Sequence, residues 1–273
     1  MIDDPAYRVR IAARIDDPVI AHYWQATVPA LSPQTFSDVA RPISNKLRAV
    51  LSDPAARHII GQPTTSFDMR RLMDEGHVLI ANLATRRLGD GIAHLIGAIL
   101  TTVLTSTAFT RDPATAPRPF YFYADEFQSF ANGAFGQILS QSRKFGLALT
   151  LSHQYLAQVP EDLRAAVLGN AATTISFRVG AEDAPLLARH LALDEIYAEA
   201  EHKGHHQLTN LANFQAFVRT LEDNQPVTYA LSPYPAPQAT APRAARVIAN
   251  SRARFGRPLD KVEAQIEHFY RHR

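Results

Sequence analysis

The sequence contains no cysteine, which excludes two kinds of site. Without thiols the chain can have neither a disulfide-stabilised scaffold nor a thiolate-ligated metal centre. Long apolar runs are also lacking. Residues 92–104 form the longest candidate, which is interrupted by His94 and two threonines and falls short of the roughly 18 to 20 residues that span a membrane. We therefore expect a buried crossover helix there. The acidic N-terminus lacks the apolar core of a signal peptide.

Neither sign of charge is in excess, because 28 Lys and Arg residues face 26 Asp and Glu residues. The resulting net charge of +2 is too small to indicate a nucleic-acid binder by itself. Residues 243–273 are different: they carry eight Lys or Arg against three acids, a net charge of +5. This basic tail could bind nucleic-acid phosphates or a partner protein, and a solvated helix face is the alternative.

The most distinctive motif is the aromatic run at residues 120–124, which ends in Asp125 and Glu126. Five uncharged residues suit a strand that is covered on both faces in a parallel sheet. In such sheets ligands bind beyond the carboxyl ends of the strands. The pattern is typical of a Walker B strand, in which Asp125 would hold Mg²⁺ and Glu126 would orient or deprotonate the attacking water. A strand that simply ends in an acidic turn is the alternative.

Two further apolar runs follow the acid pair, each after a helix-length segment. Residues 147–151 end in Ser152-His153-Gln154, and residues 173–177 end in Arg178. Strands that alternate with helices indicate βαβ units and a parallel sheet. We therefore predict an α/β fold with a mostly parallel sheet and helices on both faces. We also expect the acids, Gln154 and Arg178 to share one site.

Four segments carry a resemblance to a known family. They are Tyr-Ala-Asp-Glu-Phe-Gln (123–128), Leu-Ser-Gln-Ser-Arg-Lys-Phe-Gly-Leu (139–147), Leu-Ser-His-Gln-Tyr-Leu (151–156) and Ile-Ser-Phe-Arg-Val-Gly (175–180). In order and spacing they resemble the C-terminal half of the ATPase core of conjugative coupling proteins. These are the TraG/TraD-like type IV secretion ATPases, close to the HerA/FtsK group of DNA-pumping motors. The resemblance covers roughly residues 40–232.

The resemblance implies a RecA-like P-loop NTPase core that uses ATP and Mg²⁺ and assembles as a homo-hexamer. It also implies DNA as the substrate, and type IV secretion or relaxosome proteins as partners. The implied location is cytoplasmic, at the inner membrane, through an N-terminal anchor that would precede Met1. We expect no transmembrane segment within residues 1–273.

Residue roles follow from the same resemblance. Asp125 and Glu126 match the Walker B pair, and Gln154 matches the polar sensor of the γ-phosphate. Arg143 stands where such hexamers place an arginine finger that reaches a neighbour's nucleotide, a role that suits a planar, permanently charged guanidinium. The alternative for Arg143 and Lys144 is a pair of solvated cations at a helix C-terminus.

The phosphate-binding element of this class is missing. No stretch fits Gly-x-x-x-x-Gly-Lys-Ser/Thr, and Gly89-Asp90-Gly91 lacks both the lysine and the spacing. The resemblance therefore implies an N-terminally truncated core that binds and hydrolyses ATP poorly alone and exposes sheet edges that would normally pair. The alternative function is a non-catalytic interaction module that binds a motor subunit or a substrate protein.

Four regions are predicted along the chain. They are a helical region (1–62), the C-terminal part of the ATPase domain (63–232), a Pro/Ala linker (233–242) and the basic helical tail (243–273). Ser32 is expected to cap a helix that begins at Pro33. Within the second region we predict a buried strand at 77–83, irregular structure at 194–210, and a hairpin that closes one edge of the sheet.

Overall fold

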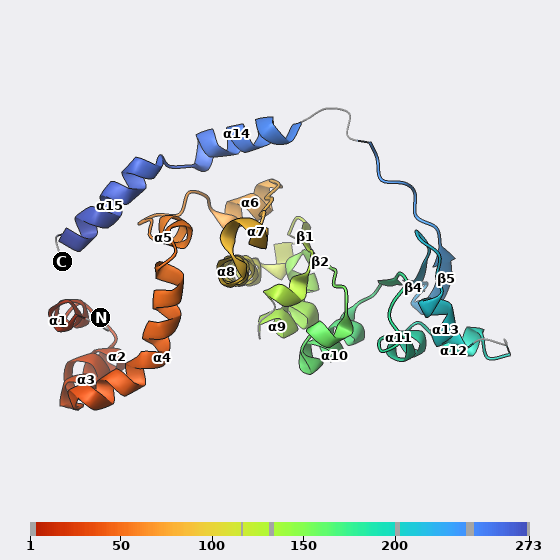
Figure 1. Ribbon diagram of the computed structural model, residues 1–273, viewed down its shortest axis with the longest axis horizontal. Helices are drawn as coiled ribbons and strands as arrows, with labels where there is room; N and C mark the ends of the chain where they lie inside the picture. Colours follow the sequence, from red (N-terminus) through yellow and green to blue (C-terminus); the bar gives the residue numbers. More distant parts are fainter. Residues whose placement is uncertain (1–3, 116, 131–133, 200–202, 239–242, 272–273) are drawn as a thin grey trace. The chain divides into compact units, whose positions relative to one another are not determined.

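The computed structural model describes residues 4–115, 117–130, 134–199, 203–238 and 243–271 (Figure 1). The chain divides into two compact units. The first comprises Met1–Phe67, Leu83–Ala93 and Ala244–Arg273, and the second comprises Asp68–Asn82 and His94–Arg243. Most of the predicted basic tail therefore belongs to the same unit as the N-terminal helices. Residues 239–242 of the predicted linker lie outside the described residues.

Helices of the first unit begin with a repeated local signal, an Asp or Ser followed by Pro. The four helices that begin in this way are α1 (Pro5–Ala12), α2 (Pro18–His22), α4 (Pro33–Leu51) and α5 (Pro54–Ile60). In each, the side chain before the proline accepts a backbone N–H of the first turn. The proline costs no hydrogen bond because its position needs no amide donor. The predicted Ser32 cap is confirmed: its Oγ accepts from the Thr35 amide at 3.1 Å.

The first unit contains further short helices and the two C-terminal ones. They are the π-helix η1 (Tyr23–Thr27), α3 (Val28–Ala30), α7 (Thr85–Leu88), α14 (Arg243–Phe255) and α15 (Leu259–Arg271). The chain's single tryptophan, Trp24, lies in η1 with its ring edge-on to that of Tyr23. Val262 of α15 is buried, and α15 contacts α5 through an ion pair between His58 and Glu263 at 3.3 Å.

The second unit holds two separate sheets. Strands β1 (Phe120–Ala124) and β2 (Leu147–Leu151) pair in parallel, as predicted, with Ala124 opposite Leu151. Strands β3 (Thr174–Ser176), β4 (Ala216–Glu222) and β5 (Gln225–Leu231) form an antiparallel sheet in that order. The fold is therefore mixed α/β with a small parallel sheet.

Two predictions about the sheet were wrong. The third apolar run does form a strand, but β3 pairs antiparallel with β4 instead of extending the parallel sheet. The predicted hairpin, β4–β5, is confirmed, but it extends β3 and does not close an edge of β1–β2. Strand β3 pairs along β4, the first strand of this hairpin, with Ile175 opposite Val218. Apolar content alone did not reveal that partner.

The predicted strand at residues 77–83 is also absent. The segment is described without any strand pairing, and its apolar side chains face solvent, with Val78 85% and Ile80 79% exposed. One face of β1 is similarly open, because Tyr121 and Tyr123 are 63% and 71% exposed. Parallel sheets are normally covered on both faces. The second unit thus presents apolar and aromatic surface that such sheets usually bury.

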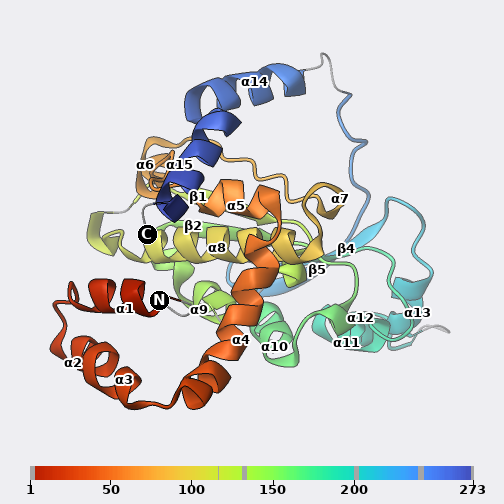
Figure 2. The same cartoon turned by 60° about the vertical axis from the view of Figure 1, so that its left-hand side comes forward.

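Helices and short turns connect and flank the strands of the second unit. They are α6 (Met69–Glu75), α8 (Asp90–Phe109, whose first turn belongs to the first unit), α9 (Ala134–Gln141), α10 (Glu161–Asn170), α11 (Ala184–His190), α12 (Leu193–Ile196) and α13 (Gly204–Thr209), with short 3₁₀ turns η2 (Pro113–Thr115), η3 (Phe127–Ser129), η4 (Ser142–Phe145) and η5 (Leu156–Gln158). Figure 2 shows α11, α12 and α13 gathered near the antiparallel sheet. The prediction of irregular structure at 194–210 was wrong for the parts that form α12 and α13, whose Leu193 and Leu208 are fully buried in one apolar cluster with Phe217. Residues 200–202 of that range lie outside the described residues.

Helix α8 extends past both ends of the apolar run at 92–104, from which a helix was predicted. Its threonines do not interrupt it, because the hydroxyls of Thr101 and Thr105 donate to the carbonyls of Gly97 (2.8 Å) and Thr101 (2.6 Å) one turn back. Among the described residues it is the one helix long and apolar enough to cross a membrane by length and composition, a test that core helices also pass. Its apolar window is 39% buried.

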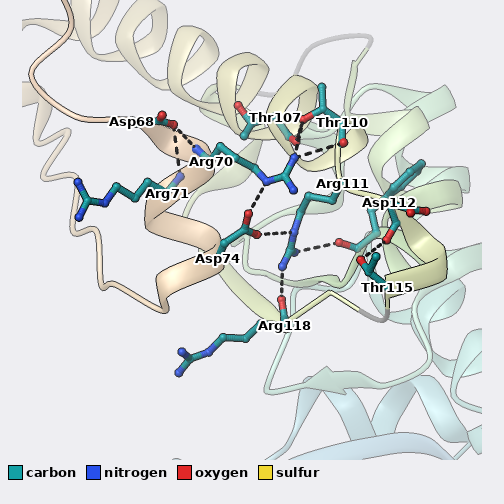
Figure 3. Close-up of polar contacts among 11 residues, drawn as sticks. Asp68, Arg70, Arg71, Asp74, Thr107, Thr110, Arg111, Asp112, Thr115 and Arg118 are labelled. Atoms are coloured by element: carbon teal, nitrogen blue, oxygen red, sulfur yellow. Dashed lines mark hydrogen bonds and ion pairs between the residues drawn. The ribbon is translucent and has the colours of Figure 1, made fainter.

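A buried arginine joins the parts of the second unit at the amino ends of β1 and β2 (Figure 3). Arg111 is 1% exposed, and its Nε donates to Asp74 Oδ1 of α6 at 3.1 Å. Its two terminal nitrogens donate to the carbonyl of Phe145 (2.9 Å), which precedes β2, and to that of Arg118, which precedes β1. Asp74 also pairs with Arg70. One guanidinium therefore holds a helix and the start of both strands together.

Gly146 lies beside this network at φ +69°, in the left-handed region that favours glycine. A Cβ there would approach the Pro117 carbonyl to 2.8 Å and Arg111 Nη1 to 3.2 Å. The Gly146 carbonyl accepts from the Phe120 amide at 2.8 Å, which starts the pairing of β1 with β2.

Candidate functional site

The carboxyl ends of β1 and β2 bring the predicted site residues together. Because Ala124 and Leu151 are opposite one another, the residues that follow each strand are neighbours. The pairing continues past the strands: the Ser152 amide donates to the Ala124 carbonyl at 3.0 Å, and the Phe127 amide donates to the Ser152 carbonyl at 3.2 Å. Asp125 and Glu126 thus meet Ser152 and Gln154.

Asp125 is exposed, and one of its oxygens is already engaged. The Ser152 hydroxyl donates to Asp125 Oδ1 at 2.5 Å. Mg²⁺ commonly takes only one or two protein carboxylates and keeps several waters, so this donor set fits a largely hydrated magnesium ion. Within the described residues no three or more His, Cys, Asp or Glu side chains gather as a metal cage.

Glu126 is held by two amide side chains. Gln154 Nε2 donates to Oε1 at 2.6 Å, and Gln128 Nε2 donates to Oε2 at 2.6 Å. Gln128 Nε2 also donates to Gln158 Oε1 at 3.1 Å, which links the turn after β1 to the turn after β2. Both carboxylate oxygens therefore have a donor, which fixes the orientation of the group. We call Glu126, Gln128, Gln154 and Gln158 the amide clamp.

The backbone of Glu126 is itself unusual. Its φ of 51° and ψ of 45° lie in the left-handed region, which costs a non-glycine residue about 1 kcal/mol or more. The next residue, Phe127, is fully buried and packs against Phe135 of α9, with ring centroids 5.9 Å apart. Burial of Phe127 and the amide clamp together hold the turn in this conformation.

His153 lies between Ser152 and Gln154 in the sequence. Its ring is half-buried and stands edge-on to Phe127 at 5.7 Å. Burial lowers the pKa of His153 below its ordinary value of 6.5, although Asp183 and Glu126 act in the opposite direction. Asp183 in turn accepts the Leu156 amide at 3.0 Å. The folded protein therefore favours a neutral imidazole next to Glu126.

Arg143 and Arg178 are not part of this cluster. Arg143 is exposed in η4, which precedes β2. Asp125 and Glu126 lie at the other end of this five-residue strand, which is about 16 Å long at ~3.3 Å per residue. With Ser140, Gln141 and Lys144, Arg143 lines a surface pocket of about 440 Å³. Arg178 follows β3 in the other sheet and donates to Asn213 Oδ1 at 3.4 Å. The expectation that Arg178 shares one sheet edge with the acids was therefore wrong.

Sequence reasoning missed three members of the site: Ser152, Gln128 and Gln158. A signal for two of them was present. Ser152 is the first residue after β2, which is the position equivalent to Asp125 after β1. Gln128 follows Glu126 by two residues within a tight 3₁₀ turn, which can return a side chain to the carboxylate. Gln158 carries no comparable local signal.

The sequence matches no family model, no curated protein and no solved structure. The resemblance to coupling proteins therefore rests on the four sequence segments alone.

Proposed function

We propose that this chain supplies the Walker B and sensor side of an ATP-hydrolysis site, in an ATP-driven DNA translocase of conjugative transfer or type IV secretion. One observation carries the proposal. An adjacent acid pair, Asp125 and Glu126, and an amide, Gln154, meet at the carboxyl ends of two in-register parallel strands. That edge is where open α/β sheets bind their ligands.

In this proposal Asp125 holds the magnesium ion, and Ser152 orients the carboxylate through its hydroxyl. A bound Mg²⁺ would neutralise charge on the β- and γ-phosphates of ATP. The rest of the phosphate contacts would have to come from a P-loop, which the sequence does not contain. The chain accordingly provides half of a nucleotide site within a RecA-like core.

Glu126 would act as the base that orients and deprotonates water. In the described arrangement Gln154 occupies Oε1 and Gln128 occupies Oε2. Each oxygen can accept a further hydrogen bond, so water can approach while both amides stay. Withdrawal of Gln154 would remove a donor from Oε1 and raise the basicity of that oxygen, whereas Gln128 can stay and keep the carboxylate oriented. Gln154 would therefore link the state of the phosphate site to the basicity of Glu126, as a sensor should.

Arg143 would act on a different subunit. It is exposed and lies at the far end of β2 from Asp125, so it does not serve the acid pair of its own chain. In a homo-hexamer an arginine at this surface would reach the nucleotide of a neighbour, where its fixed positive charge would stabilise the transition state. DNA as the substrate, and type IV secretion or relaxosome proteins as partners, belong to the same proposal.

The test is ATP hydrolysis with and without Mg²⁺ and DNA, on the chain and on any longer product of the same gene that includes a P-loop. Glu126→Gln should lower turnover of the longer product by about 10²- to 10⁴-fold, the usual contribution of a general base. Glu161→Gln, which alters an exposed acid at the start of α10, is the matched control and should leave turnover unchanged. Retention of turnover by Glu126→Gln would refute the Walker B assignment.

A second candidate function, a non-catalytic interaction module, is favoured by the open surface of the second unit. Tyr121 and Tyr123 of β1 are exposed although parallel strands are usually covered, and Val78 is exposed in the segment that follows α6. The module would bind a motor subunit or a substrate protein through this surface. Two results together would favour the module over the motor. A longer product that contains a P-loop would hydrolyse no ATP, and the chain would bind a motor subunit or a substrate protein.

A further inference from the structure

Helices α14 and α15 follow one another along the chain (Figure 1). Both have thirteen residues, but only the apolar face of α15 has buried residues. In α15 Val262 is buried, Ile266 approaches Gly61, and the Phe269 ring stands edge-on to Tyr7 at 6.2 Å. Helix α14 has no buried residue. The first unit therefore provides a partner for the apolar face of α15 but none, within the described residues, for that of α14.

The sequence of α14 is amphipathic all the same. Ala244, Ile248 and Phe255 recur at spacings of four and seven residues, which places them on one face of the helix. Val247 flanks this face. The exposed fractions of Val247, Ile248 and Phe255 are 54%, 48% and 36%. A stripe of large apolar side chains on a solvent-facing helix is costly unless something covers it.

The rest of the surface of α14 is strongly basic. At 100° per residue Arg246 lies opposite the apolar stripe, Arg243, Arg252 and Arg254 lie along its two edges, and Arg257 follows the helix. No acidic residue occurs between positions 243 and 257, whereas α15 contains three. Among the described residues none of the four arginines of α14 forms an ion pair; Arg254 lies over the Phe255 ring at 5.1 Å. The charge of α14 is therefore not neutralised within the first unit.

We propose that α14 lies on the surface of an anionic phospholipid bilayer. Its apolar stripe would enter the boundary between headgroups and acyl chains, while the arginines would reach the lipid phosphates. At about 1.5 Å per residue the helix is roughly 20 Å long, too short to span a bilayer, so it would lie in the plane of the interface.

Charge complementarity alone would also allow a nucleic acid. A phosphate backbone would engage the arginines but offers no apolar surface to cover Ile248 and Phe255. A lipid surface accounts for both faces at once. The proposal is independent of the nucleotide site, because α14 belongs to the first unit and the acid pair to the second.

The experiment is co-flotation of the full chain with vesicles, which separates bound protein from aggregates because aggregates sediment. The chain should float with vesicles of mixed phosphatidylcholine and phosphatidylglycerol, and not with vesicles of phosphatidylcholine alone. Since each basic residue near such a surface contributes about 1 kcal/mol, or about a fivefold change in affinity, Arg246→Gln/Arg254→Gln should weaken binding about 25-fold. Ile248→Ser/Phe255→Ser should abolish flotation although the charge is unchanged.

The matched control is Lys261→Gln/Arg271→Gln, which removes the same charge from α15 and should leave flotation nearly intact. Far-ultraviolet circular dichroism would verify that each variant retains its helix content. The proposal fails if the wild type does not float with the anionic vesicles. It also fails if the apolar-face variant floats as well as the wild type, or if duplex DNA is bound through α14 while the vesicles are not.

Discussion

Replacement of Arg111 by methionine is expected to destabilise the second unit by about 3 to 5 kcal/mol, the usual result of removing one partner of a buried charged network. Methionine retains much of the apolar volume of the arginine stem, so the change tests the polar contacts rather than packing. The variant loses the ion pair with Asp74 and the hydrogen bonds to the carbonyls of Phe145 and Arg118.

The magnitude follows from those three contacts. A hydrogen bond from a charged donor contributes about 1.5 to 3 kcal/mol, so three would sum to about 4.5 to 9 kcal/mol, most of which lies above the stated range. The expected loss is smaller than that sum for two reasons. Asp74 is 39% exposed and retains its contact with Arg70. Arg118 is an exposed residue, so water can replace the guanidinium at its carbonyl. Arg111→Lys should also destabilise the unit, since one ammonium cannot reach all three acceptors in the fixed geometry of a guanidinium.

Hydrogen exchange of the β1 and β2 amides, followed by mass spectrometry, measures the local stability directly. A loss of 3 to 5 kcal/mol corresponds to a fall in protection of about 150- to 5,000-fold. Arg71→Met is the matched control, because this exposed arginine pairs only with Glu75 on the helix surface, and its protection pattern should match the wild type. A change of less than tenfold in Arg111→Met would show that the network does not hold the strands together.

Two further predictions concern the same unit. Gly146→Ala should lower the stability of the second unit by about 1 to 2 kcal/mol because of the left-handed backbone, and further because the new Cβ would approach the Pro117 carbonyl to 2.8 Å. The loss should be measurable as faster hydrogen exchange of the β1 amides. Unchanged exchange would mean that the turn can shift without loss of stability. Because burial lowers the pKa of His153 in the folded state, its contribution to stability is complete above its ordinary value of 6.5 and is lost as the pH falls through the lowered folded value. Unfolding by urea should therefore become easier below about pH 6.5, with a weaker pH dependence in His153→Gln, and identical pH profiles would contradict this account.

The sequence was sufficient to predict those parts of the fold that depend on short-range pattern. The aromatic run of β1, the apolar run of β2 and the helix between them each carry their own signal. Because two parallel strands in register end at the same edge, the meeting of Asp125, Glu126 and Gln154 follows from those signals. The Ser32 cap is equally local, since it depends on the four consecutive residues 32–35.

Features that depend on distant partners were not accessible in the same way. Strand β3 is three residues long, and its antiparallel partner, β4, lies some forty residues further along the chain. The apolar segment 77–83 has the composition of a strand but lacks a neighbour with which to pair. Arg111 begins a proline-rich stretch that resembles a linker, and its burial depends on three acceptors from separate parts of the second unit.

The position of Trp24 has a consequence for the study of this protein by spectroscopy. The single indole lies in η1 of the first unit, whereas Arg111, the strands and the acid pair all belong to the second. Tryptophan emission will therefore follow melting of the helical unit and will not report on the candidate site. If the two units unfold separately, a midpoint from fluorescence and one from circular dichroism will differ, and a single melting temperature will describe neither unit.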